Sequence, residues 1–477
     1  MKMNSFIVKG RWTVYCVMLA LIVLCFGSCK DDDLNNSTEP FDPSKPVLVS
    51  DFIPKSGSVS QRLVIYGKNF GNDPKLIHVY IGGKKSNVIG VNGESLYCIV
   101  PEKAYAGNIE IFMGDGKEPV ATATGVFEYQ RKMIVSTLAG FKNERDDQGW
   151  TDGKFNIAAG FREPSFMKFD PKNPKHLYVC YDFGPGIYLI NLEDSTVRQH
   201  LTSSAGNWNR IRSLDFTLDG EYMIVSQDQG DPNGISTSIM SRANGFKAPQ
   251  ILTQSKQCNG ASVHPVNGEM YFNSYEKGEV YHFDVMNSKP VVGSLGLSSK
   301  EYETLFLVQD NGWEFNIQIH PSGNYAYIVV VNQHYILRTD YNWATKKFSQ
   351  PYVVCGEPRS GNWVDGVGSK ARLSNPYQGV YVKNPAYAGK EDEYDFYFTE
   401  QNNHDIRILT PEGKVTTFAG RGSSSINSNP HGYVEGDLRL EARFDRPSGL
   451  AYNETEKAFY VGDQMNRRIR KIALEEQ

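Results

Sequence analysis

The chain has 477 residues, of which 40% are hydrophobic and 22% are charged, with a formal net charge of −4 and a pI near 6.2. A chain of this charge has no basic stripe of the kind that phosphate backbones require. Nucleic acid is therefore not expected as a partner.

The N-terminus has the pattern of an export signal. Basic side chains at Lys2, Lys9 and Arg11 precede an apolar stretch over residues 14–26. This stretch is too short for a comfortable membrane span but has the length of the apolar part of a signal peptide. The pattern predicts that residues 1–28 form a signal peptide.

A cysteine follows the apolar stretch directly. Residues 26–29 read Phe-Gly-Ser-Cys, and small residues just before a cysteine resemble a bacterial lipobox. The resemblance implies that Cys29 becomes the N-terminus and carries lipid, so that the protein reaches the membrane through its N-terminal lipid only. A plain cleaved signal or an anchor helix is the alternative.

The segment after the cysteine indicates where the protein is exported. Residues 30–33, Lys-Asp-Asp-Asp, resemble the acidic signal that takes Bacteroidetes-type lipoproteins to the outer face of the outer membrane. The following residues are rich in Asn, Ser, Thr and Pro, so residues 29–45 are predicted to be a flexible tether.

Residues 46–130 have the pattern of a small β-sandwich, because strand-like runs alternate with Gly, Asn and Pro turns. Its motifs are Ile-Pro-Lys-Ser-Gly at 53–57, Val-Ile-Tyr-Gly-Lys-Asn-Phe-Gly at 64–71, Val-Tyr-Ile-Gly-Gly at 79–83, Val-Pro at 100–101 and Phe-Glu-Tyr at 127–129. These motifs resemble an IPT/TIG immunoglobulin-like domain. Cys98 is the only cysteine of the segment, so it has no disulfide pair there.

One spaced pattern occurs three times in residues 131–477. It consists of a small residue plus Gly, an aromatic-x-acid-Gly turn, and Ala-x-[Phe/Leu]-x-x-Pro. The copies run from Ala139 to Pro164 and include Ala159, from Cys355 to Pro376, and from Ala419 to Pro447. From the acid to the proline the steps are 12, 11 and 12 residues. A unit reused at such regular intervals predicts a stacked or radial architecture.

Short strand-like runs follow the third copy. They are Ala-Phe-Tyr-Val-Gly-Asp at 458–463 and Arg-Ile-Arg-Lys-Ile at 468–472, after Pro-Ser-Gly-Leu-Ala at 447–451. The second copy repeats part of the motif with Asn-His-Asp-Ile-Arg at 403–407. These residues closely resemble the NHL repeat, whose known fold is a β-propeller with a four-stranded sheet in each blade.

Weaker repeats are expected between Pro164 and Pro376. Strand, tight turn and strand succeed one another around residues 169–171, 217–220, 264–268 and 320–323, which is a hairpin signal. Blade starts near Pro164, Arg210, Asn259, Glu314, Pro376 and Pro447 then predict six blades. The fold class is therefore predicted to be all-β, with an immunoglobulin-like (IPT/TIG) sandwich followed by a six-bladed NHL-like β-propeller.

The strand before the first blade is expected to complete the last one. Residues 133–138 match residues 415–418 in register before an Ala-Gly pair, and the chain stops soon after residue 472. The sixth blade consequently lacks an outer strand of its own. Closure by residues 133–138 would remove an open sheet edge that invites aggregation.

Catalytic and metal-ligand patterns are absent from the sequence. The nine histidines show no His-Glu-x-x-His or comparable spacing, and neither a Ser nucleophile elbow nor a Gly-rich phosphate loop occurs. His264 and His320 occupy the hairpin-turn position of Asp170, so structural roles away from the usual ligand face are expected. No catalytic residue, metal ligand or cofactor is predicted.

The acids of the repeated turn are also expected to be structural. Asp152, Asp365 and Glu435 each stand next to Gly in the pattern, where an acid would accept backbone N–H groups. The four cysteines beyond the N-terminus could pair in an exported protein, but their scattered positions favour buried free thiols. They are Cys98, Cys180, Cys258 and Cys355.

Candidate ligand residues lie in the loops that join one blade to the next. In propellers these loops converge over the central channel and carry the ligand site. Trp150 and Trp363 are equivalent to Tyr433 and are expected to pack, whereas Trp208 and Trp313 break the repeat. Aromatic faces beside amides, Arg and acids suit an uncharged polyol. The predicted ligand-binding residues are Trp208, Asn209, Arg210, Asn259, Trp313, Glu314, Tyr377 and Gln378.

The whole architecture resembles a family of Bacteroidetes surface lipoproteins found with polysaccharide-uptake systems. The resemblance implies non-enzymatic capture of a polysaccharide or oligosaccharide at the outer membrane, for a TonB-linked transporter and its binding lipoprotein. The propeller loops would be the binding face and the sandwich a spacer.

Two other functions remain open. Related six-bladed propellers include lactonases and lyases that hold Ca²⁺ or Zn²⁺ in the channel. Here Glu314, Asn259, Asp365 and Gln378 would be the candidates for such a site, although they form no recognisable ligand set. The third possibility is a non-catalytic scaffold for surface protein assembly.

Overall fold

The computed structural model describes residues 39–476, except 141–149, 159, 183, 185, 231–233, 255–256, 275, 286–302, 309–313 and 423–427. The chain divides into two compact units, Met1–Gln130 and Arg131–Gln477. The predicted signal peptide, Cys29 and the first part of the tether lie outside the described residues. Among the residues that the structure describes, no helix is both long enough and apolar enough to cross a membrane.

The first unit is a sandwich of two antiparallel four-stranded sheets, ordered β1-β3-β7-β6 and β5-β4-β8-β9. Along β3 every second side chain is buried, as at Leu63 and Ile65, because successive residues of a strand face opposite sides. Its elements are β1 (Leu48–Ile53), β2 (Ser56–Gly57), β3 (Arg62–Lys68), β4 (Ile77–Ile81), β5 (Lys84–Lys85), β6 (Asn87–Val91), β7 (Ser95–Ile99), β8 (Ile109–Met113), β9 (Ala121–Thr122) and β10 (Glu128–Tyr129).

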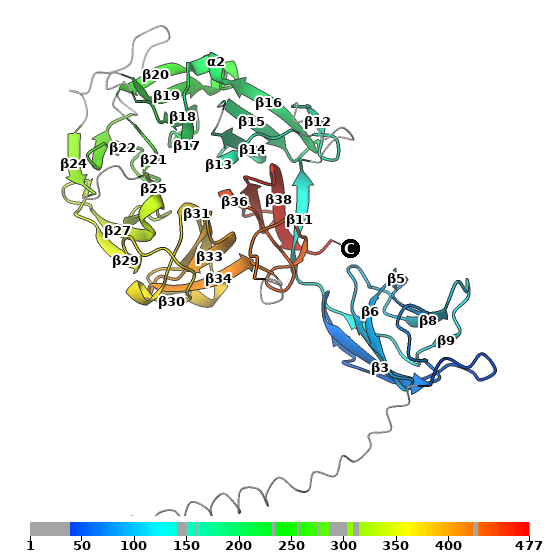
Figure 1. Ribbon diagram of the computed structural model, residues 1–477. Coiled ribbons are helices and arrows are strands. Elements are labelled where there is room, and N and C mark those ends of the chain that lie inside the picture. The colour runs from blue at the N-terminus through cyan, green and yellow to red at the C-terminus, as the bar shows by residue number, and fades with distance from the viewer. Residues whose placement is uncertain are drawn as a thin grey trace, which may run out of the picture. The chain divides into compact units, whose positions relative to one another are not determined.

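The second unit is a propeller whose described residues form six antiparallel sheets, arranged in a ring in Figure 1. The innermost strand of each blade contacts those of its two neighbours, which closes the ring. From inside outward, blade 1 has β13 (Pro164–Asp170), β14 (Asn173–Tyr181), β15 (Gly186–Asn191) and β16 (Thr196–Thr202); blade 2 has β17 (Ile211–Phe216), β18 (Tyr222–Gln227), β19 (Ile235–Ser241) and β20 (Gln250–Gln254); blade 3 has β21 (Ala261–Val263), β22 (Met270–Ser274), β23 (Glu279–Phe283) and β24 (Glu303–Leu307).

The other three blades follow the same order. Blade 4 has β25 (Phe315–Ile319), β26 (Tyr325–Val330), β27 (Tyr335–Asn342) and β29 (Tyr352–Gly356); blade 5 has β31 (Pro376–Lys383), β32 (Tyr394–Glu400), β33 (Asp405–Leu409) and β34 (Lys414–Gly420); blade 6 has β36 (Pro447–Asn453), β37 (Ala458–Asp463), β38 (Arg468–Leu474) and β11 (Met133–Ala139). Short elements are β12 (Gly153–Lys154), α2 (Ser203–Gly206), β28 (Lys347–Phe348), β30 (Gly366–Val367) and β35 (Gly436–Asp437). The predicted fold class is confirmed.

The closure of the ring follows the prediction from the sequence. Strand β11 pairs antiparallel with β38, and Val135 lies opposite Ile472. The first strand of the propeller therefore supplies the outermost strand of the last blade. Blade 6 therefore combines strands from the beginning and the end of the propeller sequence. The backbone groups of β38 that face outward are paired with β11 and do not form an open edge.

The acids of the repeated turn act as predicted. In blades 1, 5 and 6 respectively, Asp152 accepts the backbone N–H of Gln199 at 2.8 Å, Asp365 that of Thr417 at 3.2 Å and Glu435 that of Thr137 at 2.9 Å. Each donor lies on the outermost strand of its blade. The acid consequently ties the turn to that strand.

The aromatic residues of the same pattern pack against their blades, as expected. The ring of Trp150 stacks on Tyr188, with centroids 4.2 Å apart. The indole of Trp363 donates to the hydroxyl of Thr417 at 3.1 Å and lies against the guanidinium of Arg421.

The hairpin turns between the first and second strands are capped by their own first residues. A side-chain atom of Asp170, His264 and His320 accepts the N–H two residues later, at 2.9, 3.3 and 3.1 Å. The predicted structural role of both histidines is confirmed. The four cysteines expected to be buried free thiols are buried, and none of them forms a disulfide.

Candidate functional site

An acid or an amide directly follows the second strand in four blades. These residues are Asp182 after β14, Asp228 after β18, Gln401 after β32 and Gln464 after β37. All four are buried, although they begin the loops at one end of the channel. We call this end the loop face. Its polar floor comprises Glu163, Asp182, Arg210, Arg212, Asp228, Glu314, Gln401 and Gln464.

Two arginines of blade 2 form the charged half of this floor. The guanidinium of Arg210 binds Asp182 with two hydrogen bonds, Nε to Oδ1 at 2.8 Å and Nη2 to Oδ2 at 2.6 Å. Arg212 donates from Nη2 to Oε2 of Glu314 at 2.6 Å. Since Glu314 begins blade 4, this ion pair joins two blades that are not neighbours in the ring. Arg210 and Glu314, two predicted ligand residues, approach to 3.9 Å.

The position of Arg212 makes this network rigid. Burial acts to lower the pKa of Arg212, but the aromatic hydroxyl of Tyr377 and the carboxylates of Glu314 and Asp182 raise it above its ordinary value. Arg212 therefore keeps its charge inside the protein and cannot leave its carboxylates without a large desolvation penalty. The side chains of Arg210 and Glu314 are 28% and 30% exposed, so they present the network to solvent.

Amides form the other half of the floor. Gln464 donates to the carboxylate of Glu163 at 3.0 Å, and Gln401 donates to the hydroxyl of Ser448 at 2.9 Å and to Gln464 at 3.4 Å. The backbone links both halves, because the N–H of Asp182 donates to the carbonyl of Glu163 at 3.3 Å. The floor thus brings donors and acceptors from blades 1, 2, 4, 5 and 6 to one end of the channel.

Trp208 does not present its ring at this floor. Trp208 is 5% exposed and fills the core between blades 1 and 2, with its indole N–H 3.3 Å from the hydroxyl of Ser238. Its departure from the repeat reflects packing, since the ring occupies interior space rather than facing solvent. Trp313 lies outside the described residues. The backbone N–H of Asn209 donates to the side chain of Gln227, and its side-chain amide donates to the carbonyl of Asp228.

The remaining predicted residues are buried beneath the floor. The amide of Gln378 accepts the N–H groups of Met167 and Leu450, both at 2.9 Å, and donates to the carbonyl of Met167 at 2.7 Å. Its side chain is thereby occupied by backbone groups. Tyr377 lies under the guanidinium of Arg212. Both amide atoms of the Asn259 side chain are buried and have no hydrogen-bond partner in the described part of the chain.

The other end of the channel is hollow. A cavity of about 340 Å³ is lined by residues from the innermost strands of all six blades or their turns. Phe169, Tyr381 and Tyr452 supply aromatic surface, and Lys168 pairs with Asp215 at 2.9 Å. Of the ligand-binding residues predicted from the sequence, Gln378 lines this cavity. The cavity itself was not predicted, because no single repeat carries it. We call it the channel cavity.

The chemistry that this arrangement offers is hydrogen bonding. Within the described residues no group of three or more His, Cys, Asp or Glu side chains is placed to hold a metal ion. Arginine and carboxylate pairs present fixed donors and acceptors, and bonds to such charged groups are stronger than bonds between neutral ones. Neighbouring hydroxyl groups of a ligand can bind a guanidinium and a carboxylate together.

Comparisons with known proteins agree with both units. The family model of the IPT/TIG domain matches residues 46–129. A bovine (Bos taurus) protein named NHL repeat-containing protein 2 is 31% identical over 113 residues, which are 24% of this chain. The match spans only 14% of that protein, so the chain is similar to a small part of it.

Three solved Bacteroides structures are similar over 92% of this chain. An auxiliary nutrient binding protein from Bacteroides thetaiotaomicron is 47% identical, with a TM-score of 0.80 and all of its chain covered. A putative phosphatase from the same organism is 43% identical, with a TM-score of 0.79 and 99% covered. An auxiliary nutrient binding protein from Bacteroides ovatus is 38% identical, with a TM-score of 0.65 and all of its chain covered.

Proposed function

The chain belongs to the family of Bacteroides proteins that join an IPT/TIG domain to an NHL-repeat β-propeller, and from this membership we propose that it is a surface nutrient-binding protein. Two relatives that are similar over 92% of its length are described as auxiliary nutrient binding proteins. Similarity that covers both units supports a common role better than similarity of the fold alone.

The nutrient in this proposal is a polysaccharide or oligosaccharide, bound non-covalently at the loop face and delivered to a TonB-linked transporter and its binding lipoprotein. The observation that carries it is the network of Arg210, Arg212, Asp182 and Glu314, which holds charged donors and acceptors in place before any ligand arrives. A preorganised set of this kind loses little entropy on binding a hydroxyl-rich ligand.

The proposal includes anchoring through lipid on Cys29, with the acidic residues that follow directing the protein to the outer face of the outer membrane. Residues 1–28 would be removed as a signal peptide. The tether at 29–45 would let the two folded units reach a large polymer.

Native affinity electrophoresis of a protein lacking residues 1–29 tests the function. Gels are cast with plant, microbial and host polysaccharides, and bovine serum albumin serves as the non-binding standard. Retardation by a polysaccharide without release of product is the expected result. No retardation by any member of the panel would contradict the proposal.

Reaction products decide between binding and catalysis. One relative is described as a putative phosphatase, so the same samples are assayed for inorganic phosphate released from sugar phosphates and for reducing ends released from the polysaccharides. We expect neither product. Turnover that survives purification to homogeneity would replace the binding proposal with an enzymatic one.

A further inference from the structure

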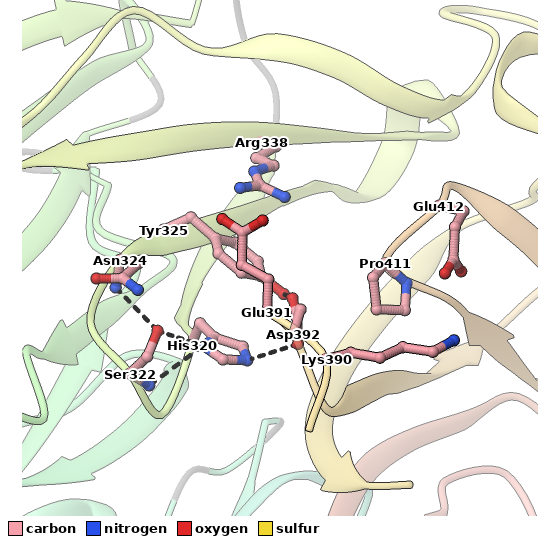
Figure 2. Close-up of a pocket in the computed structure, with 10 residues that line it drawn as sticks. All are labelled: His320, Ser322, Asn324, Tyr325, Arg338, Lys390, Glu391, Asp392, Pro411 and Glu412. Carbon is pink, nitrogen blue, oxygen red and sulfur yellow. Dashed lines mark hydrogen bonds and ion pairs between the residues drawn. The ribbon is translucent and has the colours of Figure 1, made fainter. Parts of the chain in front are cut away.

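A second hollow lies beside the channel cavity, on the face of the propeller formed by the hairpin turns. This interblade pocket has a volume of about 370 Å³ and is bounded by blades 4 and 5. Figure 2 shows its lining side chains around the space, with Arg338 on one side and Lys390 on another. None of the residues predicted from the sequence to bind ligand lines it.

One turn separates the two hollows. At the end of β25 and in the turn that follows it, Ile319 and Pro321 line the channel cavity, whereas His320 and Ser322 line the interblade pocket. The partition continues into blade 5, because the ring of His320 meets that of Tyr381 edge to face, with centroids 4.9 Å apart. Tyr381 lines the channel cavity, so the wall is about two rings thick at this point.

This wall is held by contacts on both sides. His320 stacks on Tyr325 with centroids 4.5 Å apart, and the guanidinium of Arg338 lies 4.0 Å from the same ring. The hydroxyl of Tyr325 donates to Asp392 at 2.8 Å, and Nε2 of His320 is 3.4 Å from that carboxylate. Nδ1 of His320 accepts the N–H of Ser322, so the ring proton lies on Nε2 and faces Asp392.

The interblade pocket is lined by charged groups of both signs. Nε of Arg338 donates a hydrogen bond to Asp340 at 2.7 Å. The two terminal nitrogens of Arg338 make no hydrogen bond within the described part of the chain. The carboxylate of Glu412 accepts a hydrogen bond from the side chain of Thr410, and this bond and the charge of Lys390 lower its pKa. The ammonium group of Lys390 lies 4.4 Å from the centre of the Tyr387 ring. Charges of both signs around one space favour a neutral ligand with many hydroxyls over an ion of either sign.

The channel cavity offers a complementary surface. Its aromatic residues provide apolar area for the face of a sugar ring, and the Lys168–Asp215 pair and the amide of Gln318 provide hydrogen bonds at its edge. Each hollow by itself is at the small end of the range for ligand pockets. Because they lie side by side, a chain of several similar units that passes over the wall could place one unit in each.

We propose that the channel cavity and the interblade pocket are neighbouring subsites for two units of one neutral oligosaccharide that passes over the wall between them. The carbohydrate nature of this ligand rests on the proposed function, whereas the two subsites rest on the geometry of the hairpin-turn face. The site is distinct from the loop-face floor at the other end of the channel. One propeller could then hold a polymer at one face and a chain end at the other.

Isothermal titration with oligosaccharides of defined length tests this proposal. The probes are ladders of one to six units from the maltose, cellulose, xylan and mannan series. For the series that binds, affinity is expected to rise about tenfold at the chain length that first spans the wall, the gain of one hydrogen bond to a charged group. Affinity that does not change with length would overturn the two-subsite arrangement.

Two variants assign the subsites. Glu391→Gln together with Glu412→Gln should abolish this gain with length and leave binding of one unit unchanged. Tyr452→Leu should weaken binding of one unit and of longer chains about equally. The matched control, Glu118→Gln with Glu193→Gln, removes two exposed carboxylates elsewhere and should match the wild type. Thermal melting of each protein checks that it is folded.

The outcomes separate this inference from the proposed function. The inference would be overturned, and the function left standing, if both the Glu391/Glu412 variant and Tyr452→Leu bound the longest oligosaccharides as tightly as the wild type while a loop-face variant lost binding. No binding of any ladder or polysaccharide by the wild type would overturn both.

Discussion

The side chain of Gln378 bonds both backbone groups of Met167, accepting its N–H at 2.9 Å and donating to its carbonyl at 2.7 Å. Gln378 belongs to the innermost strand of blade 5 and Met167 to that of blade 1, and these blades are not adjacent in the ring. The same amide oxygen also accepts the N–H of Leu450 in blade 6. One buried side chain therefore connects three blades across the channel.

This connection predicts a stability defect. Gln378→Ala would leave the N–H groups of Met167 and Leu450 buried without partners, each costing roughly 1–3 kcal/mol. We expect the free energy of unfolding in urea to fall by about 2–6 kcal/mol. Gln250→Ala, on the outer strand of blade 2, is the matched control and should change it by less than about 0.5 kcal/mol. Equal values for both variants would mean that Gln378 does not stabilise the ring.

The closure of blade 6 predicts a local effect. Glu435 accepts the N–H of Thr137 on β11, the strand contributed by the start of the propeller. Glu435→Ala should speed hydrogen exchange along β11 and lower the free energy of unfolding by about 1 kcal/mol. Glu193→Ala, an exposed carboxylate in blade 1, should leave exchange in β11 unchanged. Unaltered protection of β11 in Glu435→Ala would refute the assigned role.

A buried carboxylate predicts a pH dependence. Burial raises the pKa of Asp463 from 3.8 to about 6, although Arg470 and Asn466 act in the opposite direction. Between these values the folded protein holds a proton that the unfolded chain has released, so this group's contribution to stability falls as the pH rises. Asp463→Asn removes that contribution.

Urea unfolding of both proteins from pH 4 to pH 6 measures this effect. The weakened pairing with Arg470 shifts the variant's curve by a nearly constant amount, because the amide does not titrate. We expect the difference in unfolding free energy to move in favour of Asp463→Asn as the pH rises. Parallel curves would show that Asp463 does not titrate in this range.

The loop-face floor predicts a loss of carbohydrate affinity. Glu314→Gln retains an oxygen that can accept from Arg212 but removes the charge at the surface of the floor. We expect about tenfold weaker binding of the polysaccharide that retards the wild type, as for loss of one charge-assisted hydrogen bond. Affinity electrophoresis measures it, with Glu193→Gln as the control. An unchanged dissociation constant would move the site away from Glu314.

The proposed anchor predicts a change of cellular fraction. Cys29→Ser removes the thiol that would carry lipid, so the full-length protein should no longer be labelled by a fatty acid and should leave the membrane fraction. Replacing residues 31–33 by Ala should retain the lipid but reduce digestion by protease added to intact cells. Membrane association of Cys29→Ser equal to that of the wild type would argue against the anchor.

Much of the fold was predictable because each repeat carries its turn and strand patterns within a short stretch of sequence. The Asp152, Asp365 and Glu435 turns mark three blades, and the matching register before Ala-Gly indicated that residues 133–138 would close the ring. The weaker repeats were found through turns capped by Asp170, His264 and His320. Local capping and strand patterns of this kind depend on residues close in sequence, which is why they could be read from it.

The candidate site was predicted only in part. Blade starts identified Arg210 and Glu314, which the structure brings to 3.9 Å from each other. Trp208 was selected because it breaks the repeat, but a break in a pattern does not distinguish packing from exposure. Gln401 and Gln464 were missed although each follows an acid, Glu400 and Asp463, at the end of the second strand. That shared acid-Gln pair was the available signal.

The sequence by itself determined the two β units, the number of blades and the strand that closes the ring, because periodic patterns and turn residues act over a few positions. Only the tertiary structure decided which side chains share an end of the channel. Arg212 meets Glu314 and Gln378 meets Met167 across blades more than 100 residues apart in the chain. Such contacts depend on how the ring closes, and the two hollows of the hairpin-turn face arise in the same way.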